Sequence, residues 1–321
     1  MSSPASNVPG RLAVACGWSW EGLREWLLPS PTMHRRLWPL ALGLLYVAAV
    51  GLLGGLRVDH VVIALLALLD LYNEKTRLLL KVFLPFILTG VIFDSMRYFY
   101  WQGIAGRVHV AEPYHLERAW FGVGGRTLNE FFLAHHWAIL DLACGFAYLV
   151  YVAEYLAMAF VLFCRGRIDK AGTLARSFLL VNVMGFVTYF IYPAAPPWYV
   201  ERYGFGPARM NVHPSAAAAH RFDVLLGTHV FDAMYGRGVD VYGAFPSLHV
   251  AYPLIVVIVA FQLAEVRWAR WPAVLFFLLM FLSSVYLQHH YVVDGVLGIA
   301  YALVAFAAVS AWDRRRERPA A

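Results

Sequence analysis

Long runs of apolar residues dominate this chain, and short polar or basic connections separate them. A helix needs about 20 mostly apolar residues to cross the hydrocarbon core of a bilayer. The second run of apolar residues is short. An alternative to eight spans is therefore that the first two runs form a re-entrant hairpin, which leaves six. Counted separately, the runs predict eight membrane-spanning helices, over residues 37–56, 58–72, 77–100, 137–164, 174–193, 247–265, 271–288 and 291–312.

This pattern predicts an all-α polytopic membrane protein, with a six-helix transmembrane core and an N-terminal pair of membrane helices. Residues 1–36 are expected to form an amphipathic segment on the membrane surface, because tryptophans and leucines recur in it. Residues 37–76 then hold the peripheral pair of helices and residues 77–313 the core. Residues 314–321 form a basic tail.

The composition agrees with a membrane protein, because 61% of the residues are hydrophobic and only 14% are charged. The net charge of +6 comes from arginines at the ends of apolar runs, where they set membrane orientation rather than bind nucleic acid. With eight spans the short basic connections share one face, so that face and both termini are predicted to be cytoplasmic. Residue usage rich in arginine and alanine is typical of a GC-rich genome and favours the inner or plasma membrane of a bacterium.

Two long connections, over residues 101–136 and 194–246, fall on the opposite, extracytoplasmic face of this topology. All histidines except His34 lie in that outer half. Histidine is the side chain best suited to proton transfer near neutral pH. We therefore expect the chemistry of the protein on the extracytoplasmic face.

Two motifs converge on that face. A Pro-Ser-Leu-His sequence that ends at His249 begins the sixth span, and His290 and Asp294 lie where the seventh span leads into the eighth. An aspartate beside an imidazole can fix its tautomer and stabilise its cation, as a histidine that attacks phosphorus requires. His249 then suits a general acid for the leaving alkoxide. The alternative for His290 and Asp294 is a buried ion pair. Ser247 can cap the helix that begins the sixth span, and free N–H groups at a helix start suit a phosphate.

These motifs resemble the second and third motifs of the type-2 phosphatidic acid phosphatase superfamily, in which the later histidine is the nucleophile and the earlier one protonates the leaving group. The family's first motif, a lysine followed seven residues later by Arg-Pro, is absent. In its place, a Pro-Pro-Trp-Tyr turn that ends at Tyr199 resembles the inositol phosphorylceramide synthases, which are aureobasidin-sensitive. The resemblance to this branch continues through Arg221-Phe222-Asp223 to Asp294.

The resemblance implies a membrane lipid phosphotransferase. Phosphoinositol would pass from phosphatidylinositol, through a phosphohistidine at His290, to a lipid alcohol such as ceramide, with release of diacylglycerol. The implied partners are a phospholipid donor, a lipid alcohol acceptor and the bilayer, and Tyr199 would contact substrate at headgroup depth. No metal and no cofactor are implied, and the sequence has no carboxylate-rich ligand set. The oligomeric state stays open.

Because the family's basic motif is missing, we expect arginines on the outer face to neutralise the negative charge of the phosphate. Arg221 is the first candidate, because it lies in the matching loop and a guanidinium can bind two phosphoryl oxygens. Arg209 and Arg202 are the next candidates. Arg97 is a further one, although Asp94 one turn earlier makes a local ion pair the alternative.

Asp141 lies within the fourth span, where a carboxylate is costly unless it faces an interior or a cavity. We expect it to hydrogen-bond between helices, with contact to inositol hydroxyls as the alternative. Two other functions stay open for the whole chain. One is a lipid phosphate or polyprenyl diphosphate phosphatase that uses water as acceptor; the other is a transporter or structural protein, although the sequence has no internal repeat.

Overall fold

The computed structural model describes residues 38–236 and 238–317, so the whole predicted surface segment 1–36 and residues 318–321 of the basic tail lie outside the described residues. Helices joined by turns make up this part of the chain, and it contains isolated β-bridges but no strand. The chain divides into two compact units, residues 1–87 with 159–172, and residues 88–158 with 173–321. The predicted all-α fold is confirmed.

Five helical segments of the described residues are long and apolar enough to cross a membrane. They are α5 (Glu74–Ser95) with the turn after it, α9 (Ala138–Cys164), α10 (Ile168–Ile191), α15 (Arg270–Tyr286) with the short helix before it, and α16 (Val292–Glu317). Two further predicted spans are shorter apolar helices of 15 residues each, α2 (Trp38–Leu52) and α14 (Leu248–Gln262).

The prediction of one continuous span over 58–72 is wrong. The segment forms two short helices, α3 (Val58–Leu66) and α4 (Leu69–Tyr72). A helix rises about 1.5 Å per residue, so neither reaches half of the hydrocarbon thickness of about 30 Å. In this first unit α3 packs against α2. The helix α5 then starts after Asn73, whose Oδ1 accepts the Thr76 N–H at 2.9 Å.

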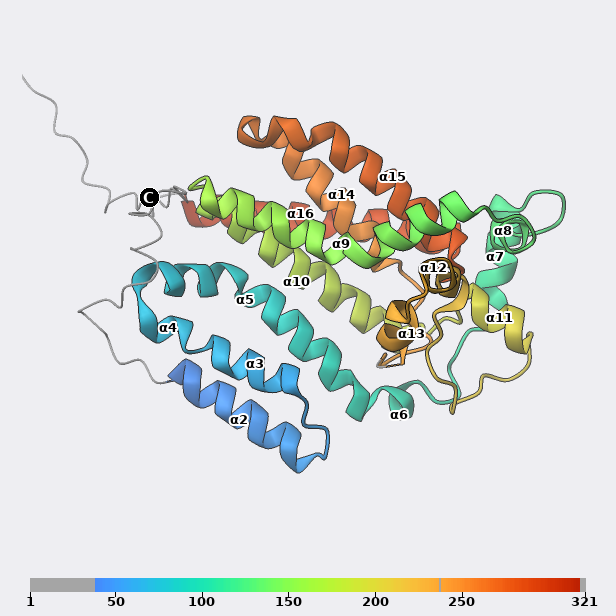
Figure 1. Ribbon diagram of the computed structural model, residues 1–321, viewed down its shortest axis with the longest axis horizontal. Coiled ribbons are helices and arrows are strands. Elements are labelled where there is room, and N and C mark those ends of the chain that lie inside the picture. The colour runs from blue at the N-terminus through green and yellow to red at the C-terminus, as the bar shows by residue number, and fades with distance from the viewer. Residues whose placement is uncertain (1–37, 237, 318–321) are drawn as a thin grey trace, which may run out of the picture. The chain divides into compact units, whose positions relative to one another are not determined.

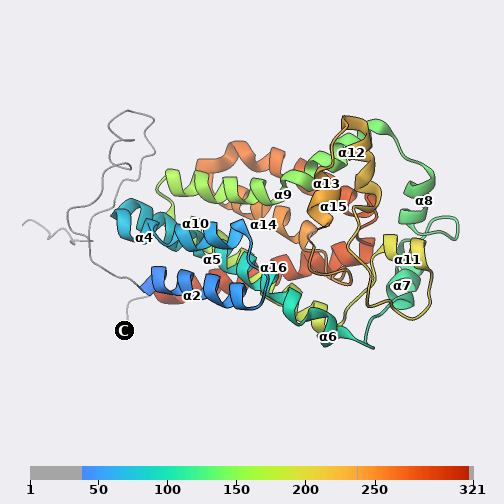
Figure 2. The ribbon, with the colours of Figure 1, turned by 60° about the horizontal axis from the view of Figure 1, so that its bottom comes forward.

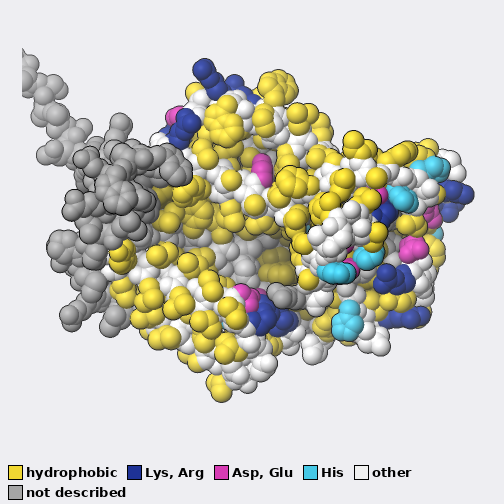
Figure 3. Space-filling view, viewed as in Figure 1, with side chains coloured by type: hydrophobic (Ala, Val, Ile, Leu, Met, Phe, Trp, Pro, Cys, Tyr) yellow, Lys and Arg dark blue, Asp and Glu magenta, His cyan; other side chains and the backbone are white. Residues whose placement is uncertain are grey.

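In the second unit α14 packs against α15 and α16, and these helices run side by side (Figure 1). The two long connections fold into short helices at one end of this bundle, as both ribbon views show (Figure 2). They are α7 (Ala111–Phe121), α8 (Leu128–Ala134), α11 (Pro197–Tyr203), α12 (His220–Leu226) and α13 (Val230–Tyr235). Histidine and arginine side chains gather over these short helices, whereas apolar side chains cover the long ones (Figure 3).

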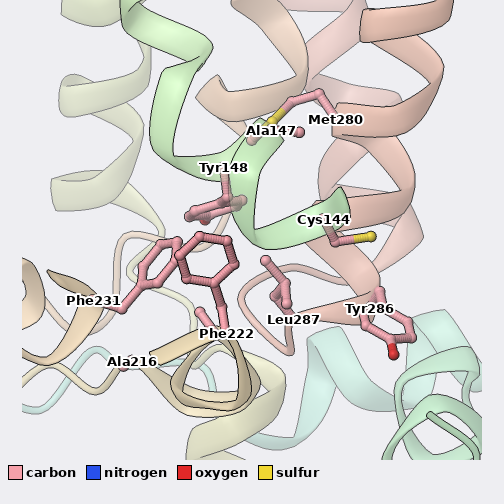
Figure 4. Close-up of a cluster of buried hydrophobic side chains, with 10 residues drawn as sticks. Cys144, Ala147, Tyr148, Ala216, Phe222, Phe231, Met280, Tyr286 and Leu287 are labelled. Atoms are coloured by element: carbon pink, nitrogen blue, oxygen red, sulfur yellow. The ribbon is translucent and has the colours of Figure 1, made fainter. Parts of the chain in front are cut away.

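A cluster of buried aromatic and aliphatic side chains joins the short helices to the bundle (Figure 4). Tyr148 of α9 lies in this cluster with Phe222 of α12 and Phe231 of α13. A Cβ atom at Gly145 would lie 2.4 Å from the Phe222 ring, so α12 can approach α9 this closely only at a glycine. The cluster therefore fixes α12 and α13 against the ends of the long helices, where His249 and His290 lie.

Candidate active site

The two histidines singled out in the sequence meet in the structure. His249 lies in the first turn of α14, and His290 lies in the segment between α15 and α16. Nδ1 of His249 is 2.9 Å from Nε2 of His290. Both rings line a cavity of about 100 Å³.

The partner of the second ring nitrogen fixes the tautomer of His290. Its Nδ1 lies 2.8 Å from the carbonyl oxygen of Ala244. Because a carbonyl oxygen can only accept, Nδ1 carries the hydrogen and donates it. In neutral His290 the lone pair of Nε2 therefore faces His249, and Nδ1–H of His249 can donate to it. A histidine that attacks through Nε2 requires this protonation pattern.

Asp294 lies close to His290 but does not hydrogen-bond to it. Its Oδ2 is 3.7 Å from Nδ1 of His290 and accepts the Tyr291 N–H at 2.8 Å. The helix α16 begins only at Val292, so His290 precedes the helix that carries Asp294. The Ala244 carbonyl is thus the direct partner of the ring, and the fully buried carboxylate contributes negative charge nearby.

A short backbone ladder positions the Ala244 carbonyl. Ala194, in the proline-rich turn after α10, forms parallel bridges to His109 and to Gly243. Its N–H donates to the Tyr242 carbonyl at 2.8 Å. The backbone of this turn therefore anchors the segment that holds His290.

Two side chains that the sequence did not single out hold the segment around His290. The buried amide of Asn129, from α8, donates to the carbonyls of Val285 at 2.9 Å and His290 at 3.0 Å. Gln288 has a left-handed φ of 69° and donates its side-chain N–H to the Asn129 carbonyl at 2.8 Å. A non-glycine residue in this conformation needs such support from its surroundings.

Glu117 of α7 is a third residue that the sequence did not reveal. It is fully buried, and its Oε2 accepts the Val293 N–H at 3.1 Å, in the first turn of α16. Burial raises the pKa of Glu117 to about 7, and the nearby Asp294 adds to this shift. A glutamate in a polar loop is normally exposed, so only the fold identifies this contact.

Aromatic and imidazole rings form the wall behind His249. Tyr148 of α9 stacks on His249 at 4.3 Å between ring centroids, and its hydroxyl lies 3.2 Å from His249 Nδ1. His289 stacks on Tyr148 and on Tyr235 of α13. Burial lowers the pKa of His289 to about 3, so this ring stays neutral and acts as a wall.

Arg221, the predicted phosphate ligand, has a different partner. Its Nε donates to Oδ1 of Asp141 at 2.6 Å, and its guanidinium lies over the Tyr286 ring at 5.0 Å. Asp141 also accepts the Tyr286 hydroxyl at 2.9 Å, which is the expected hydrogen bonding between helices. Arg221 is not among the described residues that line the histidine cavity, so its contact with phosphate stays a prediction.

Arg97 forms the local ion pair with Asp94 that was its alternative, and its Nε donates to the Asp94 carbonyl at 3.1 Å. Ser247 is the residue before α14, as expected, but its hydroxyl does not cap the helix. The Ser247 hydroxyl oxygen is buried without a partner among the described residues, whereas its N–H donates to the Asp294 carbonyl at 2.9 Å. This backbone bond joins the two motifs directly.

Tyr199 is 1% exposed and does not reach the histidine cavity. Its hydroxyl accepts the Arg209 N–H at 2.9 Å, so it supports the loop that carries this arginine. Its neighbours Pro196 and Trp198 do line the cavity. The predicted contact of Tyr199 with substrate therefore stays a prediction.

Comparison with known proteins places this site in a family. Residues 112–308 match the model of the PAP2 superfamily. A phosphoinositol dihydroceramide synthase of Bacteroides thetaiotaomicron is 36% identical over 261 residues, which are 78% of this chain and 84% of that protein. The catalytic subunit of the Schizosaccharomyces pombe inositol phosphorylceramide synthase is 30% identical over 57% of this chain and 43% of its own length. The Candida albicans inositol phosphorylceramide synthase is 28% identical over 52% of this chain and 36% of its own length. No solved structure matches the chain significantly. The chain belongs to the PAP2 superfamily.

Proposed function

We propose that this membrane protein transfers phosphoinositol from phosphatidylinositol to the hydroxyl of a ceramide-type lipid and releases diacylglycerol. The proposal rests on the pair His249 and His290, whose Nδ1 and Nε2 atoms lie 2.9 Å apart in a shared cavity. Relatives whose names state phosphoinositol dihydroceramide or inositol phosphorylceramide synthesis support this choice of donor and acceptor.

In the first step, Nε2 of His290 attacks the phosphorus and forms a P–N bond. The P–O bond to the diacylglycerol oxygen breaks, and protonated His249 gives its proton to that oxygen. Nδ1–H of His290 stays bonded to the Ala244 carbonyl. The Asp294 carboxylate, 3.7 Å away, stabilises the positive charge that develops on the imidazole.

In the second step, the ceramide hydroxyl attacks the same phosphorus. The now neutral His249 takes the hydroxyl proton as the new P–O bond forms. The P–N bond breaks, and its electron pair returns to Nε2 of His290. Both histidines thus end in their starting protonation states. N–H groups in the first turn of α14 have no intrahelical acceptor and suit the phosphoryl oxygens during both steps.

The cavity is expected to open on the extracytoplasmic side, with both termini in the cytoplasm. This orientation rests on the basic connections of the sequence. A lipid donor and a lipid acceptor can both reach such a site from the outer leaflet.

The test uses purified protein in mixed micelles with phosphatidylinositol labelled in the inositol ring. We expect formation of inositol phosphorylceramide and diacylglycerol in equal amounts, and only when ceramide is present. Rapid release of inositol phosphate without ceramide would instead establish the phosphatase alternative. No turnover of either lipid by protein that binds them would favour the transporter or structural alternative.

A further inference from the structure

A second, larger pocket adjoins the histidine cavity. It has a volume of about 440 Å³ and opens between the loop after α11 and the helix α13. Pro214, Ser215 and Tyr235 line both pockets, so they are separated only by shared side chains. Binding sites for small molecules commonly have volumes of about 300–1,000 Å³, so this pocket is large enough for a lipid headgroup.

The larger pocket presents hydrogen-bond donors held in place by aromatic rings. The guanidinium of Arg209 lies 4.7 Å from the ring centroid of Tyr203, and that of Arg202 lies 5.6 Å from the ring centroid of Trp198. Within residues 38–236 and 238–317, neither guanidinium forms an ion pair. Asn211 also lines this pocket. Nη2 of Arg202 donates only a long hydrogen bond of 3.5 Å, to the Ser215 hydroxyl. Both guanidiniums therefore keep donors for a ligand.

The smaller cavity contains a carboxylate that the phosphoryl transfer itself does not use. Asp240 lines it together with His249 and His290. One of its carboxylate oxygens lies so close to Gly243 that a Cβ atom there would be 1.9 Å away, so a side chain at position 243 would displace this carboxylate. A phosphodiester offers only acceptor oxygens and is negatively charged, so a carboxylate repels it. Hydroxyl groups, in contrast, donate hydrogen bonds that a carboxylate accepts.

We infer that the two adjoining pockets form the subsite for a polyhydroxylated headgroup of cyclitol type, with Asp240 accepting hydrogen bonds from ring hydroxyls and Arg209 and Arg202 donating to others. The inference rests on the proposed function, because it assumes that the phosphorus lies at His290. The hydroxylated ring then extends from the phosphorus past Asp240 towards the two arginines. The Asp240 carboxylate next to the phosphorus, and the two arginines together with the Asp232 carboxylate further out, match a ring that carries hydroxyls on every side.

The test compares Asp240→Asn and Arg209→Gln with two controls that also remove one charge each. Glu201→Gln and Arg126→Gln change exposed residues that line neither pocket. The Michaelis constants for phosphatidylinositol and for ceramide are measured separately, with kcat. A hydrogen bond to a charged group is worth about a factor of ten or more in affinity, so KM for phosphatidylinositol should rise about tenfold in both test variants. The controls should stay near the wild-type value.

A rise confined to KM for ceramide would contradict the inference, because it would assign Asp240 to the acceptor alcohol. An unchanged KM for both lipids would also contradict it. Turnover of phosphatidylglycerol gives a second readout, since loss of cyclitol contacts should weaken discrimination between the two donors.

A binding experiment separates failure of this inference from failure of the proposed function. Wild-type protein is titrated with myo-inositol 1-phosphate and with glycerol 3-phosphate, without any turnover. We expect tighter binding of the cyclitol phosphate, and we expect Asp240→Asn and Arg209→Gln to abolish the difference. Equal binding of both phosphates by the wild type would overturn the inference even if transfer to ceramide occurs. Preferential binding without transfer would uphold the subsite and overturn the proposed reaction.

Discussion

His290 is held at both ring nitrogens, by the Ala244 carbonyl on one side and by His249 on the other. The sequence was sufficient to select the two histidines and Asp294, because their spacing and their place at span ends are readable without a fold. It could not identify Ala244 as the direct partner of the ring. A backbone carbonyl carries no sequence signature, and this one is placed by a ladder between distant segments.

The two histidines are expected to differ in what their loss removes. His290→Asn should abolish both diacylglycerol release and transfer, because no P–N bond can form. His249→Asn should slow diacylglycerol release by about 10²–10⁴-fold, the usual contribution of general acid catalysis. Single-turnover assays of diacylglycerol release measure both effects.

His115→Asn is the matched control, because this histidine is exposed and stacks only on neighbouring rings. Substantial diacylglycerol release by the His290 variant would contradict the assignment of the nucleophile. An equal and complete loss in both variants would show that the two roles are not separable.

Glu117 predicts a dependence of stability on pH. Its pKa is raised from 4.5 to about 7 in the folded protein, so the folded state binds this proton more tightly than the unfolded state. The stabilisation of the folded state by protonated Glu117 is fully present below about pH 4.5 and is lost as the pH rises towards 7. Glu117→Gln keeps an acceptor for the Val293 N–H and removes the charge. Relative to this variant, the wild-type Tm should fall by about 2–4 °C or more between pH 5 and pH 8.

Thermal unfolding in detergent at several pH values measures this difference. The comparison with the variant isolates Glu117 from the other ionisable groups of the protein. Parallel Tm curves for the two proteins would show that Glu117 is already ionised in the folded state.

At the scale of elements, the long apolar runs predicted most helices well, since burial in a bilayer requires length and few charges. The eighth predicted span begins at 291 and α16 begins at Val292. The run over 58–72 was apolar enough to suggest a span, but it folds as two short helices. The helices of the two long connections were not predicted, because long-range contacts such as those of Asn129 stabilise them.

At the contact between α14 and α16, we expect Gly298 to be sensitive to substitution. A Cβ atom at Gly298 would lie 2.2 Å from the Ser247 carbonyl oxygen, a backbone atom that cannot rotate away. Gly298→Ala should therefore separate α16 from the start of α14 and break the bond from the Ser247 N–H to the Asp294 carbonyl. We expect the protein to stay folded but to lose most of its transfer activity, because His249 and His290 move apart.

Gly90→Ala is the control for this substitution, because Gly90 is also helical and a Cβ atom there would contact nothing within 4 Å. Transfer activity and circular dichroism are measured for both variants. Full activity of the Gly298 variant would show that the α14–α16 contact does not set the distance between the histidines.

The whole molecule carries a prediction about orientation. A green fluorescent protein fused to the C-terminus should fluoresce, and alkaline phosphatase fused there should be inactive, because the first functions in the cytoplasm and the second outside it. This follows from the basic connections on one face. The opposite pattern would place the histidine cavity on the cytoplasmic side.

The proposed reaction depends on a covalent intermediate at His290. The most direct measurement incubates the purified protein with phosphatidylinositol in the absence of ceramide, and then maps modified peptides by mass spectrometry under conditions that preserve P–N bonds. We predict phosphoinositol on His290, lost when ceramide is added and absent from the His290→Asn variant. An unmodified His290 in protein that is actively forming inositol phosphorylceramide, or the adduct on another residue, would contradict the account.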